Sequence, residues 1–174
     1  MTSAPAAGTI RPARPTDVPA IVAMVHELAA FERAADDCHL TEDQLHAALF
    51  APRPALFGHV ACAADGTPAG CALWFLNFST WEGRHGIYLE DLYVRPRERG
   101  SGLGRDLLAT LASICVERGY QRLEWAVLSW NPDRDFYAAL GATPIDGWVP
   151  YRLSGPALTR LARGRPSALA DGPR

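Results

Sequence analysis

The chain has 174 residues, of which 48% are hydrophobic and 21% are charged, and its formal net charge is −2. These values fit one soluble globular domain with a substantial core, and a pI of about 6.2 argues against nucleic acid, whose recognition needs a basic surface. No apolar run is long enough to span a membrane, and residues 1–9 lack the basic and apolar regions of a secretory signal. The four cysteines show no metal-binding spacing, so we expect no metal and a cytoplasmic location.

The basic residues are all arginine, 17 in number, and the chain contains no lysine. A lysine nucleophile or Schiff base is therefore excluded. Arginine suits phosphate binding, because its guanidinium group is always charged and presents a fixed fork of donors.

The order of the predicted elements indicates a single domain at 9–163, between a flexible leader at 1–8 and a disordered tail at 164–174. Hydrophobic periodicity, helix caps and turn residues locate each element. They are a strand at 10–14, helices at 16–34 and 41–50, strands at 56–64, 69–78 and 86–94, a helix at 102–118, a strand at 122–128, a helix at 131–140, a strand at 148–153 and a short helix at 155–163. This order predicts an α/β fold with a mixed sheet between helices.

The stretch Tyr88–Gly104 is the most informative part of the chain. It reads as a strand, then a loop rich in arginine and glycine, then the start of an amphipathic helix. Such a loop directs backbone N–H groups and the positive end of a helix at one point, which makes an anion site. The glycines allow close approach and Arg97, Arg99 and Arg105 supply charge, so the predicted anion is a pyrophosphate.

Two common nucleotide-binding motifs do not fit this loop. The lysine of a P-loop is missing, and the acidic residue of a Rossmann fingerprint would be Glu124, inside a predicted strand. Binding sites in such sheets lie in crevices at strand ends, here between the strands that end at Val94 and Leu128.

A carboxylate pair, Glu90 and Asp91, comes directly before the loop. In a regular strand these neighbours point to opposite faces. They are solvated surface charges, or partners of nearby arginines, or groups that bind a cationic substrate beside the anion site.

The segment Arg99–Gly104, Arg-Gly-Ser-Gly-Leu-Gly, resembles the (Q/R)-x-x-G-x-(G/A) acetyl-CoA motif of the GNAT superfamily of N-acetyltransferases. Within that superfamily the chain resembles the diamine (spermidine/spermine) branch over about residues 9–162. The supporting segments are Ile10–Ala13, Glu27–Glu32, Leu40–Glu42, Trp81–Gly83, Tyr88–Asp91, Trp130–Asn131, Phe136–Tyr137, Leu140–Ala142 and Gly147–Trp148.

The resemblance implies a GNAT fold, in which a mostly antiparallel sheet is flanked by helices on both faces and two central strands splay apart around acetyl-CoA. It also implies which residues hold that acetyl donor. These are Leu92, Tyr93, Val94, Arg99, Gly100, Ser101, Gly102, Leu103, Gly104, Arg105, Asn131 and Tyr137. Backbone N–H groups at Leu92–Val94 would stabilise the oxyanion of the reaction, by analogy with a bulge in the superfamily.

Catalytic roles also follow from the resemblance. It makes Glu90 the base that takes a proton from the amine through a water, with Asp91 helping to bind the cation. It makes Tyr137 the acid that protonates the departing CoA thiolate, although aromatic residues in helices more often serve packing. Asn131 would hold the pantetheine arm, cap the following helix, or do both.

The amine site of the diamine branch corresponds here to Glu32, Trp81 and Trp148, together with Glu90 and Asp91. Aromatic walls with carboxylates suit a long flexible cation. The two tryptophans fit ordinary core or dimer contacts as well. The family implies a homodimer, and a one-residue insertion near Arg84 affects where Trp81 aligns.

Three interpretations remain. The first is direct acetyl transfer from acetyl-CoA to a primary amine of a small cationic substrate, a polyamine, diamine or thialysine-like compound. The second is the same chemistry on another amine, such as an amino-acid analogue, a drug or a protein N-terminus. The third is a catalytically weak acyl-CoA-binding sensor, against which the presence of Glu90 and Tyr137 argues.

Overall fold

The computed structural model describes residues 8–163, so most of the predicted leader and the whole predicted tail lie outside the described residues. The chain divides into two compact units, Met1–Val127 and Leu128–Arg174, which we describe in turn. The single-domain organisation expected from the sequence stays a prediction. No described helix has the length and apolar character needed to cross a bilayer.

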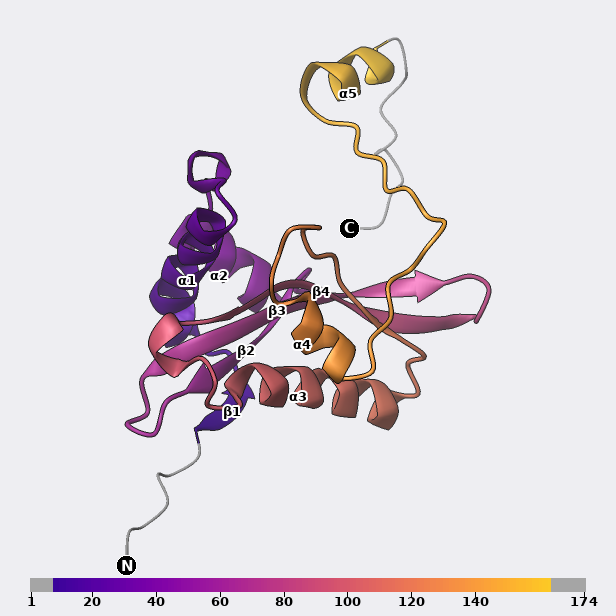
Figure 1. Cartoon of the computed structure of the whole chain (residues 1–174). Coiled ribbons are helices and arrows are strands. Elements are labelled where there is room, and N and C mark those ends of the chain that lie inside the picture. Colours follow the sequence, from indigo (N-terminus) through magenta and orange to yellow (C-terminus); the bar gives the residue numbers. More distant parts are fainter. Residues whose placement is uncertain (1–7, 164–174) are drawn as a thin grey trace, which may run out of the picture. The chain divides into compact units, whose positions relative to one another are not determined.

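The first unit is a five-stranded mixed sheet flanked by helices (Figure 1). Neighbouring strands follow the order β1-β2-β3-β4-β5, and every pair is antiparallel except the parallel β4–β5 pair. The predicted α/β class is confirmed. The elements are β1 (Thr9–Pro12), η1 (Pro15–Asp17), α1 (Val18–Phe31), η2 (Ala35–Asp37), α2 (Glu42–Phe50), β2 (Phe57–Cys62), β3 (Pro68–Ser79), β4 (Arg84–Val94), η3 (Pro96–Glu98), α3 (Leu103–Arg118) and β5 (Leu123–Glu124).

The core on one face of the sheet joins α1 and α2 to the inner residues of β2, β3 and β4. Its members are Val18, Ile21, Met24, Leu45, Leu49, Val60, Cys62, Cys71, Leu73 and Tyr93. The helix α3 buries a separate stripe at helical spacing, with Leu107 and Leu111 fully buried. Each fully buried side chain of this size contributes about 1.5–3 kcal/mol.

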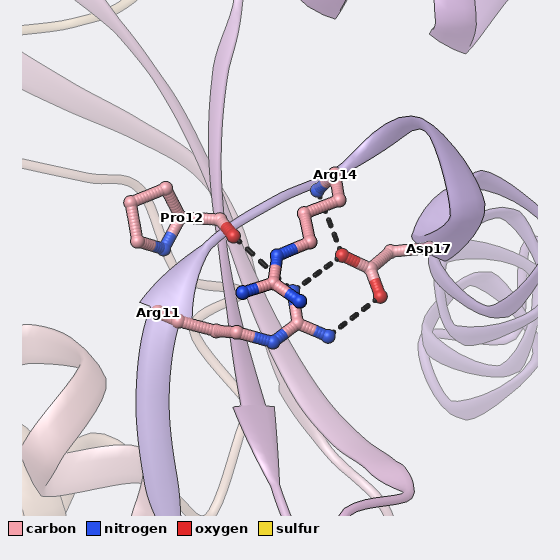
Figure 2. Close-up of polar contacts among 4 residues, drawn as sticks. All are labelled: Arg11, Pro12, Arg14 and Asp17. Atoms are coloured by element: carbon pink, nitrogen blue, oxygen red, sulfur yellow. Dashed lines mark hydrogen bonds and ion pairs between the residues drawn. The ribbon is translucent and has the colours of Figure 1, made fainter.

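A partly buried ion pair connects β1 to the start of α1 (Figure 2). Asp17 is 4% exposed and accepts two hydrogen bonds from the Arg11 guanidinium, at 2.6 and 2.8 Å. It also accepts the backbone N–H of Arg14 at 2.7 Å. The hydrogen bond from Arg11 is the main reason that the pKa of Asp17 lies below its ordinary value.

The strand β4 contains one residue more than its partner β3 at a single point. Leu73 pairs with Asp91 and the next residue, Trp74, pairs with Leu89, so Glu90 has no partner in the ladder. Because cross-strand partners share a face, Asp91 lies with Leu73 on the face covered by α1 and α2. The alternation from which we expected Glu90 and Asp91 to point to opposite faces therefore does not hold at this bulge.

Beyond the bulge, one edge of β4 carries no strand in the described part of the first unit. Within the unit, β5 pairs with β4 at two positions, Ile87↔Leu123 and Tyr88↔Glu124. The strand predicted at 122–128 is therefore shortened to two residues, because ladder pairing ends where the chain leaves β4. This departure agrees with the expected splaying of two central strands.

Backbone direction identifies the groups on this open edge. The N–H of Arg95 donates to the carbonyl of Ala69 in β3, at 2.8 Å. Since alternate residues of a strand face the same neighbour, the N–H groups of Val94 and Leu92 face away from β3.

The second unit contains two short helices, α4 (Arg134–Ala139) and α5 (Gly155–Ala162). The predicted helix at 131–140 begins later, because the Asn131 side chain accepts the N–H of Asp133 at 2.8 Å and forms a turn ahead of it. The strand predicted at 148–153 is wrong. These residues are exposed, none has a strand partner among residues 8–163, and Pro150 has no N–H to donate to a ladder.

Candidate active site

The loop between β4 and α3 forms an anion site from backbone groups. Gly100 and Gly102 have φ angles of 79° and 94°, a left-handed conformation that glycine adopts without strain. Gly102 is the N-cap of α3 and provides no side-chain acceptor for the helix. In the described chain the N–H groups of Leu103, Gly104 and Arg105 have no backbone acceptor, so the positive end of a 16-residue helix is available to an anion.

The space in front of these glycines is open. A Cβ atom built on Gly100 or Gly102 would meet no other atom within 4 Å. A phosphate group can therefore approach the backbone closely, and the predicted residues fit the pyrophosphate of acetyl-CoA.

Four arginines follow the body of β4, namely Arg95, Arg97, Arg99 and Arg105. Arg95 contacts the Glu27 carboxylate of α1, with its Nη2 3.1 Å from Oε1, and its Nη1 donates to the Pro68 carbonyl at 3.2 Å. Arg97 and Arg105 are exposed and make no ion pair within residues 8–163.

Arg99, the arginine of the motif, is held against the end of α1. Its Nε donates to the carbonyl of Val94 at 3.0 Å. Its Cζ lies 5.2 Å from the ring centroid of Phe31 and 5.6 Å from that of Tyr93, within the range of cation–π attraction.

A carboxylate cluster lies where β4 passes the end of α1. Asp91 is half-buried, and its pKa is raised to about 6, first by burial and then by the negative charges of Glu90 and Glu32. Glu32 is the C-cap of α1, where the negative end of the helix adds to the field. Three carboxylates and a helix C-terminus favour a bound cation.

An aromatic pair that was not predicted from the sequence adjoins this cluster. The rings of Phe75 and Tyr88 lie 5.1 Å apart, and these residues are cross-strand partners. Phe75 follows Leu73 by two positions in β3, so the pair shares the face of Asp91. This pair could not be predicted from the sequence, because it depends on the register between β3 and β4. Without that register, Phe75 is only one of several apolar residues in a strand.

Trp81 lies apart from the carboxylate cluster in this chain. It is 88% exposed, in the turn that joins β3 to β4. Arg84 begins β4 and stands seven positions before Asp91, which corresponds to roughly 23 Å of extended strand. Its place in an amine site stays a prediction.

Three predicted site residues belong to the second unit. Asn131 is buried and forms the turn before α4, and Tyr137 is half-buried in that helix with its ring 5.2 Å from that of Phe136. Trp148 is 71% exposed. The roles predicted for all three remain predictions. Among residues 8–163, no group of three histidine, cysteine or acidic residues could hold a metal ion.

Comparison with known proteins agrees with this arrangement. The model of the acetyltransferase (GNAT) family matches residues 22–142. The thialysine N-epsilon-acetyltransferase of Bos taurus is 37% identical, over 88% of this chain and 96% of that protein. The L-ornithine N5-acetyltransferase of Arabidopsis thaliana is 31% identical, over 87% of this chain and 86% of that protein.

A solved structure shares the fold. It is an integron cassette protein from the mobile metagenome of V. cholerae, with a TM-score of 0.74 and 27% identity over 90% of this chain and 98% of that one. The family match covers most of the sheet and the whole anion-binding loop. The chain therefore belongs to the acetyltransferase (GNAT) family and is an acetyl-CoA-dependent N-acetyltransferase.

Proposed function

We propose that this protein acetylates a primary amine of a small cationic substrate, of the polyamine, diamine or thialysine-like class. The observation that carries the proposal is the carboxylate cluster of Glu32, Glu90 and Asp91, whose member Asp91 lies three residues before the end of β4, where the anion-binding loop begins. Relatives named for thialysine and L-ornithine acetylation support it, because both of those compounds carry a cationic amine.

Acetyl-CoA, when bound, supplies the acetyl group as a thioester. The residues proposed to hold it are Leu92, Tyr93, Val94, Arg99, Gly100, Ser101, Gly102, Leu103, Gly104, Arg105, Asn131 and Tyr137. The backbone N–H groups of the loop and of the first turn of α3 bind the pyrophosphate. On the open edge of β4, the N–H groups of Leu92 and Val94 hydrogen-bond the acetyl carbonyl oxygen and stabilise the charge that develops on it.

The carboxylates prepare the amine for attack. An alkylammonium group has a pKa near 10 and must lose a proton before its nitrogen can react. Asp91 and Glu32 attract the cation, and its charge in turn favours the ionised form of Asp91. Glu90, exposed at the bulge, accepts the proton through a water.

The proposed acid is Tyr137. Tyr137 is proposed to donate its phenolic proton to the departing sulfur, because a phenol stays protonated at neutral pH. Asn131 is proposed to hold the pantetheine arm through its amide. We propose that the acetyl group passes directly to the amine, without a covalent intermediate on a cysteine.

Release of free thiol from acetyl-CoA tests this function. The amine panel is thialysine, L-ornithine, spermidine, spermine, putrescine, lysine and a peptide with a free N-terminus. We expect release with small diamines or thialysine and little with the peptide. No release with any amine, despite tight CoA binding, would instead favour the acyl-CoA sensor.

We also propose a homodimer that resides in the cytoplasm. The support is the exposed apolar segment at 148–153, in which Trp148, Val149 and Tyr151 are 71%, 72% and 95% exposed. A second copy could cover these side chains, since monomeric proteins rarely expose contiguous apolar patches.

A further inference from the structure

The two loop arginines Arg95 and Arg99 contact α1 through Glu27 and Phe31. Arg95 uses Nε and Nη2 on Glu27 and Nη1 on the Pro68 carbonyl. Arg99 uses Nε on the Val94 carbonyl and places its guanidinium over two rings. These contacts give both side chains a structural role.

The residues that receive these arginines lie one helical turn apart on α1. Glu27 and Phe31 are separated by four positions, so they occupy the same face of the helix. Tyr93, 6% exposed, joins them through its ring contact with Arg99. The loop is thus fastened to the last turn of α1.

The last turn of α1 also positions the amine-site carboxylate. Phe31 ends the helix and Glu32 follows as its C-cap. Arg33 then adopts a left-handed conformation with φ of 62°, which is unusual outside glycine and is closed by a hydrogen bond from the Ala34 N–H to the Ala29 carbonyl at 2.9 Å. Phe31 and Glu32 are therefore consecutive residues of one closed helix end.

We propose that the side chain of Arg99 has a positioning role and couples the phosphate loop to the amine site through Phe31 and Glu32, while Arg99 contributes to the CoA site through its backbone in the loop and the side chains of Arg97 and Arg105 supply the charge that meets phosphate. This inference rests on the proposed function, because it takes the loop as the CoA site and Glu32 as part of the amine site. It predicts that CoA binding improves amine binding, since an ordered loop holds Arg99, Phe31 and Glu32 in place.

Conservative variants separate the two roles. Lysine keeps a point charge for phosphate but loses the planar fork and the stacking, so Arg99→Lys should leave CoA affinity within about 2-fold and raise the amine KM about 5-fold or more. Phe31→Leu, which removes the ring on the helix side, should give the same amine defect. Arg97→Gln is the matched control: it should weaken CoA binding at low salt, with the loss shrinking as salt screens the phosphate.

The measurements are calorimetric titration of CoA at low and high salt, and thialysine KM at saturating acetyl-CoA. The inference is overturned if Arg99→Lys leaves the amine KM unchanged, or if Arg99→Gln weakens CoA binding tenfold or more at low salt and not at high salt. If the wild-type protein binds no CoA, the proposed function fails instead, and the two failures are distinct.

Discussion

At the scale of single residues, Asp91 combines its proposed place in the amine site with a cost in the free energy of folding. Burial and two neighbouring carboxylates hold its pKa at about 6, against 3.8 for a free aspartate. A carboxyl with a raised pKa in the folded state favours folding when protonated. That stability is present below about pH 4 and is lost as the pH rises through 6.

The variant Asp91→Asn should therefore stabilise the protein in alkaline conditions. Asparagine mimics the neutral acid, so we expect a gain in unfolding free energy of about 2–3 kcal/mol at pH 8, about half of it at pH 5, and none below pH 4. Urea unfolding at several pH values measures the gain, and amine KM should rise in the same variant. An equal gain at every pH would mean that the negative charge is not the cause.

Tyr137 gives the second prediction at this scale. The variant Tyr137→Phe removes one hydroxyl and keeps the ring that lies 5.2 Å from that of Phe136. We expect kcat to fall about 10²-fold or more, the range of general-acid catalysis, with CoA affinity nearly unchanged. An unchanged kcat would contradict the proposed role of Tyr137 as the general acid.

At the scale of elements, the ion pair of Arg11 and Asp17 fixes β1 to the start of α1. Removing the carboxylate in Asp17→Ala leaves the Arg11 charge and the Arg14 N–H without their partner. We expect a loss of about 2–4 kcal/mol in unfolding free energy at pH 7. Because the pKa of Asp17 is lowered, its contribution is present above the unfolded value of 3.8 and disappears as the pH falls below it.

Urea unfolding at pH 7 provides the measurement. Asp65→Ala is the matched control, since the Asp65 carboxylate accepts its hydrogen bonds from the N–H and hydroxyl of Thr67 within an exposed turn. Similar losses of unfolding free energy in the two variants would contradict the larger contribution expected from the Arg11–Asp17 pair.

The loop before α3 makes another prediction at this scale. In Gly100→Ala the left-handed backbone is strained by about 1 kcal/mol, and the added methyl group projects into open space where phosphate is expected. CoA affinity should fall at least 10-fold by calorimetric titration. Gly83→Ala is a matched control, because Gly83 has φ of 63° and equally open space in the β3–β4 turn. Equal CoA affinity in the two variants would contradict the anion site.

The sequence predicted those elements whose signals are local. Periodicity and caps located α1, α2 and α3, and turn residues located the β2–β3 pair. The bulge at Glu90, the short β5 and the unpaired 148–153 segment depend on which strands meet, and no local pattern contains that information. The loop of the anion site was predictable from its glycines, whereas the pairing of Arg99 with Phe31 required the packing of α1 against β4.

At the scale of the whole molecule, the exposed segment at 148–153 makes oligomeric state the main test. Val149→Asp places a charge in this apolar segment and should shift the protein from dimer to monomer. Size-exclusion chromatography with light scattering at several concentrations measures the mass. Ala109→Asp is a control, because Ala109 is exposed on α3. A monomer mass for the wild-type protein at every concentration would contradict the proposed dimer.

The bulge at Glu90 has a wider consequence, because it absorbs one extra residue without changing the faces of the strand on either side. Tyr88 and Asp91 share a face although three positions separate them, and Tyr93 and Arg95 follow Asp91 on that face by ordinary alternation. If Glu90 were paired regularly in the ladder instead, Asp91, Tyr93 and Arg95 would all turn to the opposite face, away from α1. Removal of Glu90 would leave a regular ladder with these residues on their present face, so the bulge gives Glu90 a place outside the ladder while the residues after it keep their contacts.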